Sequence, residues 1–396
     1  MALTPPLLIG PDRLGRSVAV ADGLVVAEPP PQAARLPCPE GEITAGAVCA
    51  HTHLYSGLAH YAMPPAIPAP ENFLQILERV WWKLDRALDA ETLRASAMDY
   101  VARALLAGTT TLVDHHESPN LIEGSLEILA EVCEQLGVRA LLCYGATERN
   151  FGTAEGRRGL DECRRMPSSP LLRGLVGLHA SFTVSDETIR AAGRLAEELD
   201  TVMHVHVAED AADVADAIAR GYPGPLERLE RLGALPRGSI LAHGVHLDGE
   251  QARRSAELGC WLVHNPRSNE GNRVGYALSL GCSDRVALGC DGWDADMAVE
   301  NEALARLAGI HGDVKAQGRL GNGHALVAER FSSHPEPLQP GAIGDVVVRQ
   351  DGAVRHVVVG GRAVVEDGAL CTGDFDHITA DAREQSRRLW KRMAEI

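Results

Sequence analysis

The stretch DETIRAAGRLAEELDTVMHVHVAED, residues 186–210, decides the fold, because it holds one complete helix-then-strand unit. Residues 186–199 carry apolar side chains at helical spacing, and residues 201–207 form a near-continuous apolar run. Such a run beside an amphipathic helix is typical of a buried parallel strand. The strand ends with His206, and Glu209 follows shortly after it. The unit therefore predicts a parallel sheet with ionisable groups at the carboxyl end of a strand.

The same unit recurs along the chain. Glycines stand where helix C-caps are expected, at Gly137, Gly233 and Gly259. Eight such units predict an α/β fold, a closed (β/α)8 barrel of the TIM type. Almost every run ends in a polar or ionisable residue, which is where such barrels carry their chemistry. The runs are residues 43–50, 109–114, 138–144, 174–179, 201–207, 239–243, 260–265 and 285–291, and the helical patterns include 72–106, 121–136, 186–199 and 248–258.

The two flanks of the chain have a different character. Residues 5–42 and about 335–375 are rich in Val, Gly and Pro and contain short strand-like runs. They predict a small β-sandwich-like domain that is built from both chain ends. Residues 380–396 have the pattern of an amphipathic helix. The predicted domains are 1–45 and 331–396 for the two parts of the small domain, with the terminal helix in the second, and 46–330 for the barrel.

Composition narrows the class of protein. The chain has 396 residues, with 54 acidic and 38 basic side chains and a formal charge of −16, which argues against nucleic acid or an anionic membrane as a partner. No apolar stretch reaches 18 residues, so we expect no transmembrane helix. The nine cysteines include no Cys-x-x-Cys pair and are typical of buried thiols in a reducing cytoplasm.

Four of the strand ends carry side chains suited to a metal site, those of the first, fifth, sixth and eighth runs, and His243 ends the sixth. His51 and His53, two residues apart on an extended segment, face the same side of the chain. His206 can supply a third imidazole, and Asp291, after the eighth run, can add a carboxylate. Such ligands with an open position suit catalytic Zn²⁺ or Fe²⁺. Taken alone, each residue also fits a loop, turn or core position, and only their shared place at the ends of strands favours a site.

Five stretches carry a resemblance to a known family: residues 50–59 (AHTHLYSGLA), 81–85 (WWKLD), 114–119 (DHHESP), 204–210 (HVHVAED) and 265–269 (NPRSN). They resemble the amidohydrolase superfamily, in its mononuclear aminohydrolase branch of cytosine, guanine and adenosine-type deaminases and chlorohydrolases, and within that branch the SsnA group. The resemblance spans nearly the whole chain. Relatives with two metals use a carboxylated lysine near the fourth strand, whereas Lys83, Lys315 and Lys391 all lie far from it in the sequence. A site with one metal is therefore favoured.

The resemblance implies roles for individual residues. Glu209 is expected to shuttle protons, and His243 to polarise the attacking water or the substrate. Asp291 is expected both to bind the metal and to take part in catalysis, with His51, His53 and His206 as the other ligands. His179 matches a position that often contacts substrate. The other residues expected to line the mouth of the site are Tyr55, Trp82, His115, Arg149 and Asn150, and Trp81 more weakly.

These observations predict a metal-dependent hydrolase. The leading hypothesis is deamination of an amino-substituted N-heterocycle of purine, pyrimidine or pterin type, with one divalent metal per subunit, Zn²⁺ or else Fe²⁺. Ring opening of a cyclic amide and dechlorination of a triazine use the same chemistry and stay open as alternatives. An inactive binding protein with this fold is a further alternative, although it should have lost ligands. The resemblance also implies a homo-oligomer, a dimer.

Overall fold

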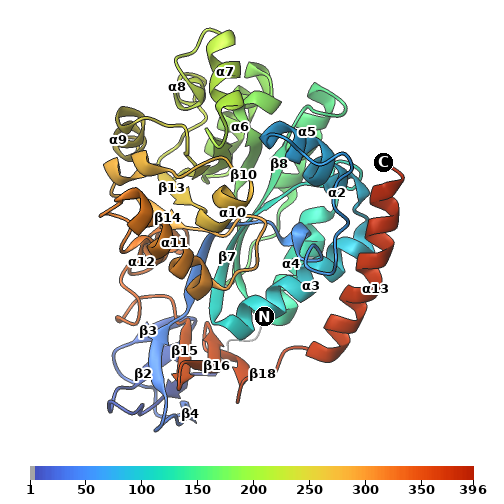
Figure 1. Ribbon diagram of the computed structural model, residues 1–396. Helices are drawn as coiled ribbons and strands as arrows, with labels where there is room; N and C mark the ends of the chain where they lie inside the picture. Colours follow the sequence, from blue (N-terminus) through green and yellow to red (C-terminus); the bar gives the residue numbers. More distant parts are fainter. Residues whose placement is uncertain (1–4) are drawn as a thin grey trace.

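Eight parallel strands form a barrel in the computed structural model, which describes residues 5–396 (Figure 1). Hydrogen bonds join them in the predicted order from first to last. A bridge between Thr52 and Asp291 then joins the first strand to the segment after the last. The TIM-type barrel is thus confirmed. Its strands are β6 (Ala47–Thr52), β7 (Thr109–His116), β8 (Arg139–Ala146), β10 (Val176–Ala180), β11 (Met203–Val207), β12 (Ile240–His243), β13 (Trp261–His264) and β14 (Val286–Leu288), and the short β9 (Leu172–Gly174) pairs with β8.

The first apolar run, residues 43–50, is divided between two sheets. Its beginning belongs to β5 (Glu42–Ala45), which pairs with a strand from the other end of the chain, and the barrel strand starts only at Ala47. Gly46 lies between the two. A Cβ atom there would lie 2.2 Å from the Thr110 hydroxyl oxygen, so only glycine lets the chain pass this close to β7. The single predicted strand is therefore wrong at this point.

Helices cover the outside of the barrel (Figure 1). The long pattern at 72–106 is interrupted, since Leu88 is extended and the Asp89 side chain caps a new helix by accepting from the Thr92 amide. Gly137 ends α4 in the left-handed conformation, as its position predicts. The helices are α1 (Phe73–Ile76), α2 (Trp82–Ala87), α3 (Ala90–Ala107), α4 (Ser125–Leu136), α5 (Thr153–Arg165), α6 (Asp186–Glu198), α7 (Ala211–Ala219), α8 (Pro225–Arg231), α9 (Gly249–Glu257), α10 (Pro266–Gly271), α11 (Met297–His311) and α12 (Arg319–Phe331). Short helical turns are η1 (Leu54–Ser56), η2 (Leu77–Trp81), η3 (Ser181–Thr183) and η4 (Leu278–Cys282).

Two further sheets form the smaller β domain below the barrel in Figure 1. One has the order β3-β2-β1-β4, and the other has the order β18-β17-β16-β15-β5. Ile9, Val20, Ile43, Val346 and Val358 belong to one buried apolar cluster, so both chain ends contribute to the core. The predicted small domain is confirmed, while its boundaries stay predictions. Its strands are β1 (Leu7–Ile9), β2 (Val18–Ala21), β3 (Leu24–Val26), β4 (Ala34–Leu36), β5, β15 (Val346–Gln350), β16 (Ala353–Val359), β17 (Arg362–Glu366) and β18 (Ala369–Leu370).

The chain ends with helix α13 (Phe375–Ala394), which runs beside α3 and α2 of the barrel (Figure 1). It starts earlier than the pattern at 380–396 predicts, because the Asp374 side chain caps it by accepting from the His377 amide. The Trp390 indole donates to the Tyr61 carbonyl at 2.9 Å. This helix therefore ties the end of the chain to the barrel. Within the described residues, no helix combines the length and the apolar character that crossing a membrane requires.

Candidate active site

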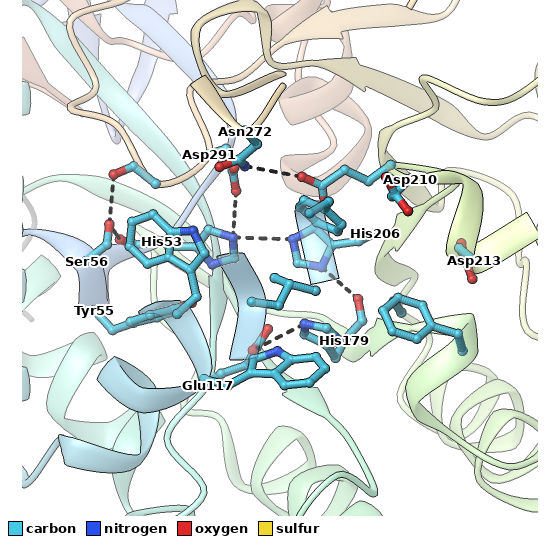
Figure 2. Close-up of a pocket in the computed structure, with 18 residues that line it drawn as sticks. His53, Tyr55, Ser56, Glu117, His179, His206, Asp210, Asp213, Asn272 and Asp291 are labelled. Atoms are coloured by element: carbon cyan, nitrogen blue, oxygen red, sulfur yellow. Dashed lines mark hydrogen bonds and ion pairs between the residues drawn. The ribbon is translucent and has the colours of Figure 1, made fainter. Parts of the chain in front are cut away.

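Five polar side chains converge at the carboxyl end of the barrel. His51 and His53 come from the end of β6, His206 from β11, His243 from β12, and Asp291 follows β14. Asp291 Oδ1 lies 2.8 Å from His53 Nε2 and 3.3 Å from His51 Nε2. His206 Nε2 lies 3.3 Å from His53 Nε2 (Figure 2). All five side chains are buried. The strands thus bring together the residues that the sequence singles out as ligands.

Hydrogen bonds set which nitrogen of each imidazole faces the centre. His53 Nδ1 lies 2.5 Å from the carbonyl oxygen of His115, and His206 Nδ1 lies 2.7 Å from that of His179. A carbonyl oxygen only accepts, so both Nδ1 atoms carry a proton and donate it. In the neutral form of each ring, Nε2 then keeps a lone pair that points into the cluster. This is the tautomer that a metal ligand needs.

His51 is oriented by a second histidine behind it. His51 Nδ1 lies 2.9 Å from His204 Nε2, and His204 Nδ1 lies 3.7 Å from Cys143 Sγ. Cys143 Sγ in turn donates to the Asp114 carbonyl. This chain of bonds is consistent when His51 Nδ1 donates to His204, which leaves His51 Nε2 unprotonated. His204, whose role the sequence leaves open between core packing and function, therefore acts as a support for a candidate ligand.

Three strand ends adopt strained backbone conformations. His243 has φ of 74° and Asp291 has φ of 55°, and Ala208, beside Glu209, has φ of 50°. Residues with a side chain rarely occupy this left-handed region, and such strain of about 1–3 kcal/mol each tends to occur at functional sites. Here it occurs at the ends of β11, β12 and β14, where the candidate site lies. His243 Nδ1 is then held at 2.9 Å by Asn269 Oδ1, which accepts from it.

Glu209 lies beside this cluster and differs from Asp291 in protonation. Burial, and next the Asp291 carboxylate, raise the pKa of Glu209 well above its usual value, which favours its protonated form. Burial acts on Asp291 in the same direction, but His51 and His53 outweigh it and hold the pKa of Asp291 well below the usual range. One Glu209 oxygen lies 3.7 Å from His243 Nε2. The two carboxyl groups are therefore set up as a proton donor and an anion.

The arrangement fits a divalent metal. One oxygen of Asp291 and ring nitrogens of His51, His206 and His243 all lie within 4.8 Å of one another, and His53 contacts the same aspartate oxygen. His51 Nε2 and His243 Nε2 are buried and have no hydrogen-bond partner among the described residues. Burial lowers the pKa of His51 to about 3, which keeps this ring neutral. Three imidazoles and a carboxylate are the donor set typical of Zn²⁺ or Fe²⁺.

A cavity opens next to this cluster, with about 650 Å³ of empty space that includes its open mouth. Of the residues expected to contact substrate, Tyr55, Trp82 and His179 line it, as does Trp81. Its wall combines aromatic rings with carboxylates and histidines (Figure 2). The full lining is His53, Tyr55, Ser56, Phe73, Leu77, Trp81, Trp82, Glu117, His179, Ala180, Phe182, His206, Glu209, Asp210, Asp213, Asn272, Asp291 and Gly292. The site can therefore hold a small molecule against the candidate metal ligands.

The other three expected contacts lie outside this lining. His115 is buried behind the cavity, with Nε2 3.0 Å from the Leu178 carbonyl oxygen. Arg149 stands behind Trp82, with its guanidinium carbon 4.6 Å from the indole centroid. The Asn150 amide donates to Glu155 at 2.8 Å, at the start of α5. His115 and Arg149 thus contact residues of the cavity wall, Glu117 and Trp82, whereas the Asn150 side chain is bound to Glu155.

Several residues of the site escape sequence analysis. Glu117 lies in the cavity wall and contacts His115, His179 and Arg149. Asp85 pairs with Arg149 at 2.8 Å, and Ser268 donates to Asp291. Burial raises the pKa of Glu117, but His179, His115 and Arg149 outweigh it and the net shift is downward. Glu117 and Asp85 stand in stretches quoted for the resemblance, so their motifs marked the place, whereas only the fold shows their contacts.

A catalytic barrel with a buried three-histidine, one-aspartate centre defines a class of metal-dependent hydrolases. The model of the Amidohydrolase family matches residues 43–328, and the chain belongs to this family. It is 27% identical over 390 residues to a 5'-deoxyadenosine deaminase of Methanopyrus kandleri, covering 88% of this chain and 86% of that one. It is 29% identical over 276 residues to an 8-oxoguanine deaminase of Pseudomonas aeruginosa, covering 65% of this chain and 59% of the relative.

Solved structures share the fold over nearly the whole chain. An adenosine deaminase from Xanthomonas campestris with bound zinc has a TM-score of 0.80 at 23% identity, covering 97% of this chain and 98% of that one. Guanine deaminase of E. coli has a TM-score of 0.74 at 20% identity, covering 89% and 93%. At these identities, the likeness supports the architecture of barrel and small domain.

Proposed function

We propose that this protein hydrolytically deaminates an amino-substituted N-heterocycle of purine, pyrimidine or pterin type. The observation that carries the proposal is the buried cluster of His51, His53, His206 and Asp291, with the protonated Glu209 beside it at the cavity. The deaminase names of the curated relatives favour deamination over the opening of a cyclic amide. Intact ligands and a lined cavity also argue against an inactive binding protein.

The four-residue cluster would hold one divalent metal, which we propose to be Zn²⁺, with Fe²⁺ as the alternative. A metal bound there supplies Lewis-acid chemistry and lowers the pKa of a water ligand to about 7. His53 supports this assignment. Burial lowers the pKa of His53, but the hydrogen bond that His53 donates to Asp291 outweighs this effect and raises that pKa to about 9. In the metal-free protein a proton therefore joins the two side chains, and a bound cation would replace that proton.

The residues of this chain then manage the protons. Glu209, protonated before substrate binds, donates its proton to the ring nitrogen next to the amino-bearing carbon. Asp291 and His243 accept the protons that the attacking water gives up. A carbon–oxygen bond forms and the carbon–nitrogen bond breaks. Asp291 and His243 return the two protons of the water to Glu209, which passes one to the departing amine, so that it leaves as ammonia, and keeps the other, so that it starts the next cycle protonated. Asn272, whose amide reaches a Glu209 oxygen at 3.5 Å, helps to orient this carboxyl group.

Mass spectrometry of products tests the reaction. The zinc-loaded protein is incubated with aminopurines, aminopyrimidines, pterins, chlorotriazines and cyclic amides. Exchange of an amino group for oxygen changes the mass by about one unit, whereas ring opening adds about 18 units. We expect the first change, and ring opening or loss of chlorine alone would overturn the proposal.

The Glu209→Gln variant tests the proton shuttle. An amide has the shape of the protonated carboxyl but cannot cycle a proton, so we expect turnover to fall about 100-fold or more while metal content stays the same. Glu123→Gln, on an exposed glutamate that pairs with Arg158, serves as the matched control and should keep full activity. Full activity in Glu209→Gln would remove the role assigned here. The homodimer and the cytoplasmic location expected from the sequence stay predictions.

A further inference from the structure

Glu117 is a buried carboxylate that the proposed reaction does not use. It follows β7 directly, its side chain is 3% exposed, and it lines the cavity together with His179 (Figure 2). Its Oε2 lies 3.3 Å from Arg149 Nη2 and 3.6 Å from His179 Nε2. Its Oε1 is buried and accepts no hydrogen bond from any residue that the structure describes. A buried carboxylate oxygen without a donor is costly. Oε1 faces His115 behind the wall, whereas Oε2 lies on the side of His179, which lines the cavity.

The histidines beside Glu117 do not satisfy it in their neutral forms. His115 Nε2 lies 3.0 Å from the Leu178 carbonyl oxygen and donates to it, so its Nδ1, 3.2 Å from Glu117 Oε1, carries a lone pair. His179 Nδ1 donates to the Thr183 hydroxyl at 3.1 Å, which itself donates to a carbonyl. His179 Nε2 therefore also turns a lone pair toward Glu117. Of these three neighbours, only Arg149 offers Glu117 a hydrogen.

The position of Glu117 suits contact with a ring held at the metal ligands. One carboxylate oxygen of Glu117 and ring nitrogens of His179 and His206 lie within 4.8 Å of one another. A cation between them is disfavoured, because the Arg149 guanidinium already occupies one side of Glu117. Trp82 flanks the same wall, and its buried indole nitrogen has no acceptor among the described residues. Glu117 Oε2, which lies near His179 and has Arg149 as its donor among the described residues, can accept a further hydrogen bond from an N–H group of a heterocycle.

The charge of the cavity restricts the substrate further. Its wall holds Glu117, Asp210, Asp213 and Asp291 besides Glu209, while no Lys or Arg occurs among the described residues that line it. Away from the proposed metal, a phosphate or carboxylate on the substrate would meet several like charges in a partly dry site, which costs free energy because no basic side chain of the lining compensates it. The cavity therefore favours molecules that are neutral or positively charged and rich in hydrogen-bond donors.

From these contacts, and resting on the deaminase activity proposed above, we propose that Glu117 determines specificity by accepting a hydrogen bond from a second N–H group of the substrate. The preferred substrates are then amino-heterocycles that carry another amino or ring N–H group besides the amino group that leaves, and that lack phosphate and carboxylate groups. Asp85 and Arg149, paired at 2.8 Å behind this wall, position Glu117.

A matched pair of purines tests the assignment. For 2,6-diamino-9-methylpurine and 6-amino-9-methylpurine, which has no N–H group besides the amino group that leaves, the ratio of kcat/KM values is measured on the same preparation, so the folded fraction cancels. We expect the wild type to prefer the diamino compound by about 10- to 100-fold, the span of a hydrogen bond to a charged group. In Glu117→Ala the ratio should fall close to one, and in Glu117→Gln, which keeps an acceptor oxygen, it should lie between. An unchanged ratio in Glu117→Ala would overturn the assignment.

Two further measurements distinguish the hydrogen bond to Glu117 from other causes of the preference. Asp210→Asn removes a charge from the same cavity and keeps a good cap for α7, so the ratio should stay at its wild-type value if the hydrogen bond, and not overall charge, decides it. A preference for adenosine over adenine that disappears in Glu117→Ala would assign the carboxylate to sugar hydroxyls and overturn recognition of the ring.

Binding separates this proposal from the reaction itself. Dissociation constants for both purines are measured by calorimetry on the zinc-loaded Glu209→Gln variant, with and without Glu117→Ala. Suppose that the two purines bind with different affinities, that this difference depends on Glu117, and that no panel compound gives a product. This result would refute the proposed reaction but would support the role of Glu117 in recognition. Turnover by the wild type, together with equal affinity of the variants for both purines, would support the proposed reaction and refute the role of Glu117.

Discussion

Replacing His204 with alanine tests whether the second histidine of HVH supports the metal site. The His204 ring is fully buried and lies 2.9 Å from His51 Nδ1. Without it, the His51 Nδ1–H has no acceptor in a dry environment, and leaving such a donor unpaired costs about 1–3 kcal/mol. His51 can then satisfy itself only by rotating or by moving its proton to Nε2, the atom that faces Asp291. At 1.4 kcal/mol for each factor of ten, this cost predicts a loss of zinc affinity of about 5- to 150-fold.

The assay is competition for zinc against a fluorescent chelator at fixed pH. His204→Asn offers an oxygen acceptor and should recover part of the affinity. His246→Ala, an exposed histidine three residues after His243, is the matched control and should bind zinc like the wild type. Thermal unfolding of the metal-free proteins accounts for the packing lost with the imidazole. Wild-type zinc affinity in His204→Ala would refute the view that this hydrogen bond orients His51.

Three other results are expected. Arg149→Met leaves Glu117 and Asp85 buried without their cation, so it should lower the free energy of unfolding by about 3–5 kcal/mol in urea titrations. Arg158→Met, which breaks an exposed pair, should lower it by less than about 1 kcal/mol. Equal losses in the two variants would contradict this prediction. Burial raises the pKa of Asp213 from 3.8 to about 6, so the native state binds its proton more tightly and this group makes stability fall as the pH rises from about 4 to about 6. Asp213→Asn should remove that dependence, worth up to about 3 kcal/mol, and parallel stability curves for the two proteins would speak against it. Removal of metal by a chelator should lower Tm, and zinc should restore it, because a ligand that binds only the native state stabilises that state; a Tm indifferent to both would contradict the metal site.

The sequence is sufficient to predict the barrel and the residues at its strand ends. The apolar runs that lead to His51, His206 and Asp291 can be recognised from the local pattern of residues. A parallel barrel then collects the ends of all such strands at one face. The division of the first run at Gly46 escapes this reasoning, because it depends on the pairing of β5 with β15, about 300 positions away in the chain. The break before Asp89 also escapes it, since a capping box interrupts an otherwise continuous helical pattern.

The supporting contacts of the site are harder to predict for the same physical reason. A pattern shows which residues are ionisable, but the proton positions of His115 and His179 follow from carbonyl and hydroxyl groups on other segments. Glu117 stands in a quoted motif, yet its unsatisfied oxygen is visible only once Arg149 and the neighbouring rings have been placed around it. Asn269 likewise becomes a partner of His243 only through the fold.

The bridge between Thr52 and Asp291 bears on how the protein comes to be assembled. The two residues are 239 positions apart, and the barrel closes where they meet. A nascent chain therefore cannot complete the four-residue cluster until its eighth strand has been synthesised, and the entropy of closing so long a loop makes this contact a late one. A metal ion bound by His51, His53 and Asp291 would link the two sides of this closure. In the metal-free protein, separation of β6 from the segment after β14 would then be the first step of unfolding, and hydrogen exchange along β6 and β14 would reveal it.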